Sequence, residues 1–365
     1  MKRKIYVNGT ILNENPTGLG VYTKNIINKL KYKAHIKVFT PINIDDVEVI
    51  KTTKYLKPNY KKKGGMVRFL YTQFIMPFKV RGNSILYHPF QYLSLLSNKK
   101  QIITIHDFIP LHYPKVAKHQ YNYYKYFMPI LLKKAYKIVC ISNQTKGDLL
   151  KFYNVEESKI KVVYNGYDRE LFNRGNVHGD VIENLNINYP YILMVGGGYS
   201  HKNLHSAIMA YSQIEDNKGV KLVIVGKTSP YIERLKSMVE ELNLEDKVNF
   251  VGYISDDNLP SLYGKAEAFL YPTLYEGFGL PILEAWACGT LVLCSNNSSL
   301  KEVSEDGAIT FNPESIEEIK TALEIVINKK EIDYIERTKL RGELLLGKYS
   351  WEKTTEEIYE VIKGI

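Results

Sequence analysis

Residues 271–289 read YPTLYEGFGLPILEAWACG, and within this stretch a strand pattern gives way to a helical one. The apolar run at 268–273 is short and aromatic, as expected of a buried strand. Pro281 occupies the first position of the helical pattern, where its missing amide hydrogen is tolerated, and Gly289 stands just past the last turn. The stretch therefore predicts a strand, a glycine-containing loop and a helix over 281–288.

The same alternation continues on both sides of this stretch. In the second half of the chain, β-branched runs bounded by glycine or proline alternate with helical patterns, which predicts a doubly wound parallel α/β sheet. The first half repeats the rhythm less regularly and predicts a second nucleotide-type sheet. The strands expected are 4–8, 36–41, 85–88, 101–106, 137–142 and 160–164, then 190–195, 222–226, 247–253, 268–273, 290–295 and 308–312, with helices near 203–213, 229–242, 257–264, 281–288, 298–304 and 315–328.

The length of the chain favours two domains. At 365 residues it exceeds the usual size of a single core. Residues 173–189 are polar and rich in asparagine, so we place a linker there, between a domain over 1–172 and a second over 190–346. Ligands of open α/β sheets bind beyond the carboxyl ends of the strands, so two such domains predict a cleft lined by these loops.

The net charge of +10 is distributed unevenly. Residues 1–170 hold 30 Lys plus Arg against 10 Asp plus Glu, which leaves 19 against 29 for the rest of the chain. An anionic membrane surface or an anionic acceptor fits the basic half. Nucleic acid is disfavoured as a partner, because the sequence has no zinc finger, no RNP-like aromatic motif and no evident recognition helix.

Two basic stretches of the first half carry many aromatic residues. Residues 51–82 hold nine Lys plus Arg and no acid, and 111–137 hold six lysines and no acid. Such stretches can engage lipid headgroups, or they can form a solvated basic face with the aromatic rings turned into the core. The aromatic residues concerned are Tyr55, Tyr60, Phe69, Tyr71, Phe74 and Phe78, and the run from Tyr121 to Phe127.

The chain has neither a secretory leader pattern nor an apolar run of about 20 residues. We therefore expect a cytoplasmic protein, with peripheral attachment to the inner face of the membrane if the basic half binds lipid. Cys140, Cys288 and Cys294 lie in or beside apolar segments and lack a partner at metal-ligand spacing, so we expect reduced, packed thiols.

Two glutamates of the quoted stretch are candidates for ligand binding. Glu276 and Glu284 lie just before the helix and in its early turns, so both can face one ligand. A carboxylate accepts two hydrogen bonds, which suits the vicinal hydroxyls of a sugar, and the amides at a helix start suit a phosphate. Alternatively, Glu284 only complements the helix dipole.

The segment EGFGLPILEA resembles the signature of retaining GT-B glycosyltransferases of family four. The resemblance implies a GT-B fold, contact of Glu276 with the donor sugar, and contact of Glu284 with the nucleotide ribose. It also implies that the backbone amides of Phe278, Gly279 and Leu280 lie near sugar and phosphate.

Further segments are similar to the same family. VGGGYSHKN at 195–203 resembles a strand and loop in which a lysine, here Lys202, binds the donor diphosphate. TIHDFIPLHYP at 104–114 and NPTGLGVYTKNI at 15–26 resemble the segments that bring a histidine and a glycine-rich loop to the donor. YSWEKT at 349–354 implies a C-terminal helix, within 347–365, that packs back on the first domain. The residues carried over are His106, Gly18, Gly20, Gly196 and Lys202, with Lys227 as a second phosphate candidate; each has a structural alternative as a cap, a packed histidine or a solvated lysine.

These expectations combine into a retaining, metal-independent transferase. It would move a hexose from a nucleotide-diphosphate sugar to a saccharide acceptor, expected to be lipid-linked, without any cofactor. The paired acids at 45–46 and 256–257 are adjacent and lack the D-x-D spacing of metal-dependent transferases. A dinucleotide oxidoreductase is disfavoured, because His201 stands where its fingerprint needs a glycine. A related sugar-nucleotide enzyme such as an epimerase, and a non-catalytic module of the membrane surface, remain the alternatives.

Overall fold

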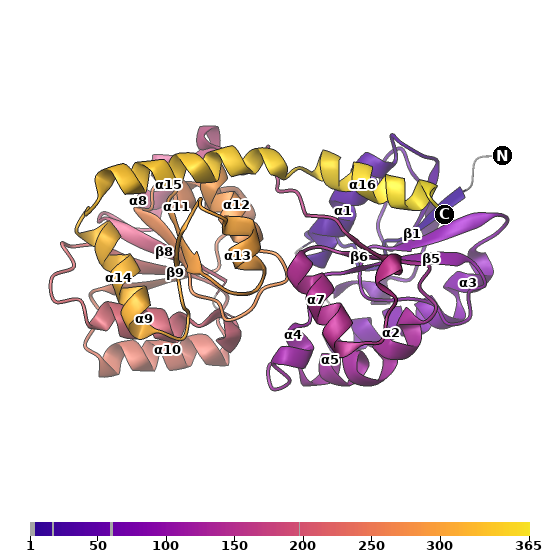
Figure 1. Cartoon of the computed structure of the whole chain (residues 1–365), viewed down its shortest axis with the longest axis horizontal. Helices are drawn as coiled ribbons and strands as arrows, with labels where there is room; N and C mark the ends of the chain where they lie inside the picture. Colours follow the sequence, from indigo (N-terminus) through magenta and orange to yellow (C-terminus); the bar gives the residue numbers. More distant parts are fainter. Residues whose placement is uncertain (1–3, 17, 59–60, 197) are drawn as a thin grey trace. The chain divides into compact units, whose positions relative to one another are not determined.

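The structure is a computed structural model that describes residues 4–16, 18–58, 61–196 and 198–365. Its contacts divide the chain into two compact units, which we call the first and the second unit (Figure 1). The first unit comprises residues up to Gly166 together with Ser350–Ile365, and the second comprises Tyr167–Tyr349.

A seven-stranded parallel sheet forms the first unit, in the order β3-β2-β1-β4-β5-β6-β7. The order reverses between β1 and β4, from which the chain winds outward in both directions. The strands are β1 (Lys4–Asn8), β2 (Ile36–Thr40), β3 (Glu48–Lys51), β4 (Ser84–His88), β5 (Lys100–Ile105), β6 (Lys137–Cys140) and β7 (Ile160–Val162). The helices are α1 (Leu19–Leu30), α2 (Lys61–Phe74), α3 (Met76–Lys79), α4 (Ile109–His112), α5 (Lys118–Asn122), the π-helix η3 (Tyr123–Phe127), α6 (Met128–Leu132), α7 (Asn143–Phe152) and α16 (Trp351–Lys363), with short 3-10 turns η1 (Lys54–Leu56) and η4 (Glu157–Lys159).

The second unit is built on a six-stranded parallel sheet in the order β10-β9-β8-β11-β12-β13. Its strand order reverses between β8 and β11. The strands are β8 (Tyr191–Val195), β9 (Lys221–Val225), β10 (Val248–Gly252), β11 (Ala268–Tyr271), β12 (Val292–Ser295) and β13 (Ile309–Phe311). The helices are α8 (Gly179–Asn184), α9 (Leu204–Ser212), α10 (Pro230–Glu241), α11 (Leu259–Gly264), α12 (Leu280–Ala287), α13 (Ser298–Ser304), α14 (Ile316–Ile327) and α15 (Ile332–Leu345), with 3-10 turns η5 (Arg174–Asn176), η6 (Ser200–Lys202), η7 (Asp256–Asn258) and η8 (Leu346–Lys348).

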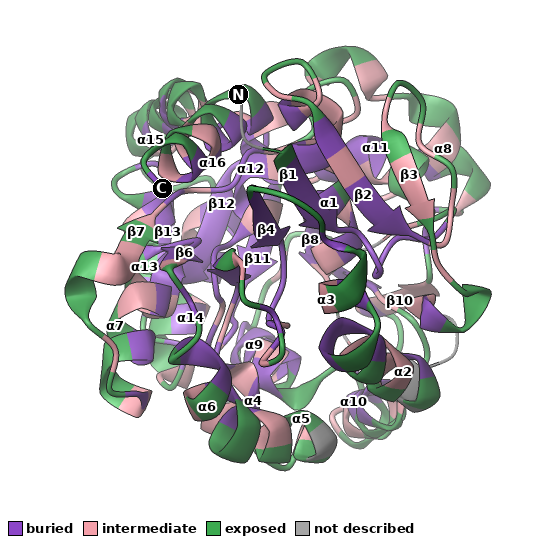
Figure 2. Ribbon diagram, turned by 90° about the vertical axis from the view of Figure 1, so that its right-hand side faces the viewer, coloured by how far each residue is buried: buried purple, intermediate pink, exposed green. Residues whose placement is uncertain are grey.

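The central strands of both sheets are buried on their two faces, so they are continuous apolar runs such as YILMV in β8. Figure 2 shows the strands mostly buried and many helices exposed on part of their surface. The predicted fold class is confirmed, because both units are doubly wound parallel α/β domains. Among the described residues, no helix is long and apolar enough to cross a bilayer.

The carboxyl-terminal helix α16 packs on α1 within the first unit (Figure 1). Ser350 caps its start by accepting a hydrogen bond from the amide of Lys353, and Trp351 lies buried beside the ring of Tyr22. A Cβ atom on Gly166 would lie 2.8 Å from Cα of Trp351, so the chain crosses itself closely at this point. The return of the C-terminal helix to the first domain is thus part of the observed fold.

The predicted linker and the observed division of the chain differ. Residues 173–189 lie inside the second unit, where they form η5 and α8. The amide of His178 donates to Ser261 Oγ at 2.9 Å, and the side chain of Val177 packs against Gly264 of α11. A few apolar side chains therefore anchor a segment whose overall composition is that of a loop.

Helix α15 contacts α12 through a glycine. A Cβ atom on Gly342 would lie 2.5 Å from Cδ1 of Trp286, whose indole is fully buried and donates to Gly307 O at 2.9 Å. Because the indole is fixed by this hydrogen bond, α15 can lie this close only without a side chain at position 342.

We expect Gly342→Ala to destabilise the second unit by about 1–3 kcal/mol, because overpacking against Trp286 outweighs a gain of about 1 kcal/mol in helix propensity. Gly347→Ala is the matched control, since a Cβ atom there meets nothing within 4 Å. The two tryptophans lie one in each unit, so a Trp351→Phe background leaves Trp286 fluorescence as the reporter of urea unfolding. Equal midpoints for the two alanine variants would contradict the packing argument.

Candidate functional site

The reversal of strand order in the second unit places two loops side by side. The loop after β8 carries Lys202, and the loop after β11 carries Glu276 before α12 begins at Leu280. Parallel strands end at the same edge of a sheet, and a crevice opens there between neighbours whose connections leave in opposite directions. Lys202 and Glu276 thus come together at the position where open α/β sheets bind their ligands.

Lys202 and Glu276 form an ion pair, with 2.7 Å between Nζ and Oε1. Their side chains are only 18% and 12% exposed, so this pair is far less screened by solvent than a surface pair. Thr273 Oγ1 also donates to Glu276 Oε1 at 2.8 Å. Burial by itself raises the pKa of Glu276, but the charge and hydrogen bond of Lys202 oppose it, and the pKa lies below its ordinary value. Glu276 is therefore an ionised carboxylate at neutral pH.

The loop that carries Glu276 is held by the start of α13. Ser299 Oγ donates to the carbonyl oxygens of Glu276 and Phe278 at 2.9 and 2.7 Å, and the amide of Glu276 donates to Ser298 Oγ at 3.2 Å. Gly279 caps α12 with a φ of 121°, a conformation that favours glycine, and a Cβ atom there would lie 2.8 Å from Leu300. These contacts fix the backbone of Phe278, Gly279 and Leu280 at the helix start.

Asn203 joins the two loops, and sequence reasoning did not single it out. It is buried in the left-handed conformation with a φ of 60°, which asparagine tolerates better than most residues. Its Nδ2 donates to the carbonyl oxygens of Pro272 and Pro313 at 3.0 and 2.8 Å. The only sequence signal was an asparagine directly before a helical pattern, which gives no indication of these distant partners.

Glu284 lies on α12 in a different environment from that of Glu276. Tyr263 donates its hydroxyl to Glu284 Oε2 at 3.0 Å. Burial raises the pKa of Glu284 to about 7, the tyrosine hydrogen bond partly opposes this rise, and the charges of Asp256 and Asp168 add to it. Burial raises the pKa of Tyr271, and the charges of Glu276 and Glu284 raise it further, so both carboxylates lie near this tyrosine.

The remaining candidates of the second unit lie on neighbouring loops. Gly196 has a φ of 93°, and a Cβ atom there would lie 3.9 Å from Cε of Lys202, so this glycine borders the lysine. Lys227 is exposed, with its Nζ 4.6 Å from the centroid of the Tyr253 ring. The structure thus gathers Gly196, Lys202 and Glu276, whereas Lys227 contacts an aromatic ring on the loop after β10.

In the first unit, His106 follows β5 and is buried. Its Nε2 donates to the carbonyl oxygen of Pro89 at 2.7 Å, so Nδ1 is the acceptor nitrogen of the neutral ring. Burial lowers the pKa of His106 to about 4, against a smaller opposing effect of the Pro89 hydrogen bond. His106 is therefore neutral at physiological pH and suited to accept a hydrogen bond rather than to carry charge.

Gly18 and Gly20, the two candidate glycines of the first unit, lie at the start of α1. Gly18 caps the helix with a φ of 50°, and a Cβ atom on Gly20 would lie 2.8 Å from Cβ of Pro16. Tyr22 on the same helix packs edge-on against His106, with ring centroids 4.6 Å apart. The start of α1 and His106 are thus brought together through one tyrosine.

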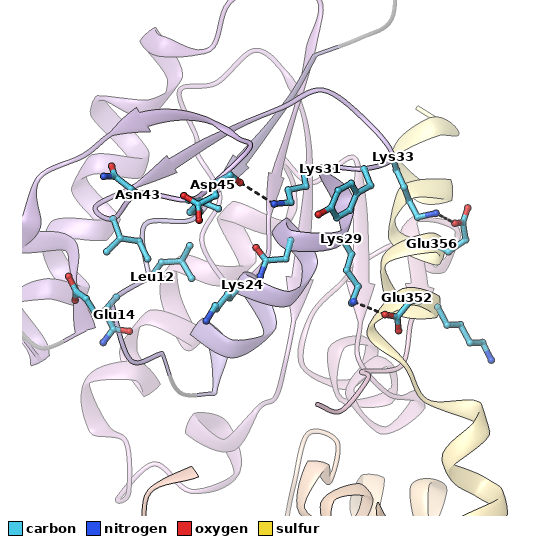
Figure 3. Close-up of a pocket in the computed structure, with 16 residues that line it drawn as sticks. Leu12, Glu14, Lys24, Lys29, Lys31, Lys33, Asn43, Asp45, Glu352 and Glu356 are labelled. Carbon is cyan, nitrogen blue, oxygen red and sulfur yellow. Dashed lines mark hydrogen bonds and ion pairs between the residues drawn. The ribbon is translucent and has the colours of Figure 1, made fainter. Parts of the chain in front are cut away.

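The first unit also contains a cavity of about 1110 Å³ between α1, the loop after β2 and α16 (Figure 3). Lysines and carboxylates line it, and two ion pairs form between them. Lys29 Nζ lies 2.5 Å from Glu352, Lys33 pairs with Glu356, and Lys31 donates to the carbonyl oxygen of Asp45. The two ion pairs join α16 to α1 and to the turn after it, and the five lysines and four acids that line the cavity leave little net charge for a ligand.

Two family models match the chain. Residues 17–171 match Glycosyltransferase Family 4, and residues 180–341 match Glycosyl transferases group 1. The O-antigen chain mannosyltransferase RfbU of Salmonella typhimurium is 33% identical over 62% of this chain, and the alignment spans 60% of that relative. O-antigen chain mannosyltransferase B of Escherichia coli is 27% identical over 73% of this chain and 70% of its own length.

Among solved structures, sucrose-phosphate synthase from Thermosynechococcus elongatus has a similar fold, with a TM-score of 0.78 at 21% identity over 100% of this chain and 99% of that chain. The first family model ends at residue 171, close to the boundary between the two units at Gly166, and the second lies wholly within the second unit. The chain therefore belongs to the GT-B glycosyltransferases, with an amino-terminal Glycosyltransferase Family 4 domain and a carboxyl-terminal group 1 domain.

Proposed function

We propose that this protein is a retaining hexosyltransferase that takes its sugar from a nucleotide-diphosphate donor. The observation that carries the proposal is the buried Lys202–Glu276 pair at the reversal of strand order, beside the start of α12. A cation and helix amides suit a diphosphate, and a carboxylate suits sugar hydroxyls. The relatives named above are mannosyltransferases of O-antigen chains, which favours mannose as the transferred sugar.

In this proposal, Lys202 and the helix start stabilise the leaving group. The nucleoside diphosphate gains negative charge as its bond to the sugar breaks, and fixed positive groups reduce that cost without reorganising. Lys202 would then exchange part of its contact with Glu276 for a phosphate, which leaves Glu276 able to accept hydrogen bonds from the sugar. We infer that no metal ion is needed for the diphosphate and that no other cofactor takes part.

A mechanism that retains the configuration of the donor sugar fits the weak basicity of His106. An inverting transferase needs a general base for the acceptor hydroxyl, and His106, whose pKa is lowered to about 4, is a weak base. In the retaining mechanism proposed here, a leaving phosphate oxygen accepts the proton of the acceptor while the acceptor attacks from the same face. His106 would orient the donor sugar through its acceptor nitrogen.

We propose a saccharide carried on a lipid as the acceptor, in the synthesis of a cell-surface polysaccharide. The relatives are named for O-antigen chains, and the excess of positive charge in the first 170 residues suits an anionic lipid carrier.

Glu276→Gln should lower kcat by about 10²–10³-fold, because the change removes a charge that acts in the transition state. Lys202→Met should lower both donor affinity and stability, since it leaves Glu276 partly buried without its partner. The double variant should regain stability without regaining activity, as measured by thermal unfolding and sugar transfer.

The exposed ion pair Lys236–Glu233 is the matched control. Lys236→Met and Glu233→Gln should change neither the thermal stability nor the rate of sugar transfer appreciably. Recovery of activity in the Lys202→Met/Glu276→Gln variant would show that the pair acts only in folding.

Donor binding should strengthen roughly tenfold between pH 6 and pH 8, because Glu284 ionises with a pKa of about 7 and the carboxylate accepts ribose hydroxyls better than the acid. Titration calorimetry with a nucleotide-diphosphate sugar measures this, since its phosphodiester groups do not titrate in that range. Glu284→Gln should bind more weakly at pH 8 and show a flat profile.

The raised pKa of Glu284 also determines how the free energy of unfolding changes with pH. A carboxyl whose pKa is raised by folding binds more protons in the folded state, so its contribution falls as the pH rises from about 4.5 through 7. Glu284→Gln should therefore be more stable relative to wild type at pH 8 than at pH 5. The reverse order would contradict the assigned environment of Glu284.

Transfer should continue in excess EDTA at an unchanged rate, because we infer that lysine and helix amides hold the diphosphate. The assay follows release of the nucleoside diphosphate from the donor after prolonged chelation. Loss of activity on chelation with recovery on adding magnesium or manganese would make the metal-independent mechanism wrong.

A further inference from the structure

The middle of the first unit is almost free of acidic residues. Residues 51–137 contain 17 Lys plus Arg and a single acid, Asp107. Such an imbalance produces a positive potential over the helices of this region and attracts anionic surfaces.

Helix α2 carries an exposed apolar stripe. Met66, Leu70 and Phe74 follow one another at a spacing of four residues and are 67%, 46% and 58% exposed. Residues spaced by four share one face of a helix. Tyr71 of the same helix is buried in a cluster with Phe39 of β2 and Leu86 of β4. The helix is therefore apolar on both its core face and its outer face.

A second helical segment extends this surface. Tyr126, Phe127 and Ile130, from η3 and α6, are all about half exposed. Phe69 of α2 joins the two segments, because its ring centroid lies 5.7 Å from that of Phe127. We call the exposed residues of both segments the apolar face; they are Met66, Leu70, Phe74, Tyr126, Phe127 and Ile130.

Exposed lysines accompany the apolar face. Lys63 lies one turn before Met66, Lys125 contacts the Tyr126 ring with its Nζ 5.4 Å from the centroid, and Lys133 and Lys134 follow Ile130. Long cationic side chains can reach headgroups while neighbouring apolar groups enter the acyl boundary. This arrangement is that of an interfacial surface.

We propose that the apolar face and its lysines bind the surface of an anionic lipid bilayer. Nucleic acid fits less well, because half of the apolar face, namely Met66, Leu70 and Ile130, has no flat ring for a base to stack on. The inference goes beyond the proposed transfer reaction and does not depend on it.

Co-sedimentation of the full chain with vesicles tests the proposal. Wild-type protein should bind vesicles of phosphatidylglycerol and phosphatidylcholine at low salt, bind less as salt rises, and bind phosphatidylcholine alone at least tenfold more weakly. Leu70→Gln/Phe74→Gln should reduce binding at least tenfold. Leu340→Gln/Leu344→Gln is the matched control, since these leucines are 58% and 71% exposed at the same spacing on α15 of the second unit.

Co-sedimentation also tests the contribution of the lysines beside the apolar face. Lys63→Glu/Lys125→Glu should also reduce binding at least tenfold and flatten its salt dependence, whereas Lys301→Glu/Lys330→Glu, on exposed positions of the second unit, should not. Thermal unfolding of each variant checks its fold. Failure of the wild type to bind anionic vesicles, or equal binding by the Leu70→Gln/Phe74→Gln variant and its control, would overturn the proposal. So would tighter binding to single-stranded nucleic acid that depends on the same residues.

Discussion

The candidate donor site depends on one topological constraint, the reversal of strand order between β8 and β11. All six strands of the second unit are parallel, so their carboxyl ends lie at one edge, and only at this reversal do the loops of two adjacent strands leave toward opposite sides. Asn203 holds the loop after β8 against the loop after β11, because its side-chain amide donates hydrogen bonds to the carbonyl oxygens of Pro272 and Pro313. These backbone restraints bring the two loops together, and Lys202 Nζ lies 2.7 Å from Glu276 Oε1.

The two glutamates of EGFGLPILEA acquire opposite electrostatic properties from their neighbours. Glu276 has Lys202 within hydrogen-bonding distance and a pKa below the ordinary value, whereas Glu284 has only a tyrosine hydroxyl and nearby acids, and its pKa rises to about 7. Pairs of titratable groups whose environments push their pKa values apart are characteristic of catalytic sites. Glu276 is thus a permanent charge, and Glu284 can gain or lose a proton when a ligand binds.

Sequence patterns predicted most of the fold because parallel strands buried on both faces are continuous apolar runs. They missed β3, whose sequence EVIK is short and half exposed at the sheet edge. They also located no helix over 1–172, where α2, for example, is apolar on two faces, and they did not predict α8 or α15 in the second unit. They also placed a linker over 173–189, where the structure has η5 and α8, because composition does not reveal that Val177 packs against α11.

For the candidate site too, the sequence could identify some residues and not others. Lys202, Glu276 and Glu284 lie in motifs and could be named from the sequence, but their roles there rested on resemblance. Tyr263, Tyr271 and Asn203 act through partners tens of residues away, such as Glu284 for Tyr263, and no local pattern encodes such contacts. Local sequence therefore predicts which side chains can do chemistry, whereas the tertiary contacts determine the charge state in which they do it.

The aromatic residues of 51–82 divide between the two readings that their composition left open. Tyr71 is buried and Phe69 is half buried against Tyr123 and Phe127, as a core requires, whereas Tyr55, Phe74 and Phe78 are exposed; Tyr60 lies outside the described residues. Along α2, Phe74 follows Tyr71 by nearly one helical turn, yet Tyr71 is buried and Phe74, the last residue of the helix, is exposed. Composition can predict that the segment is basic and aromatic, but only the tertiary contacts determine which rings remain available to a partner.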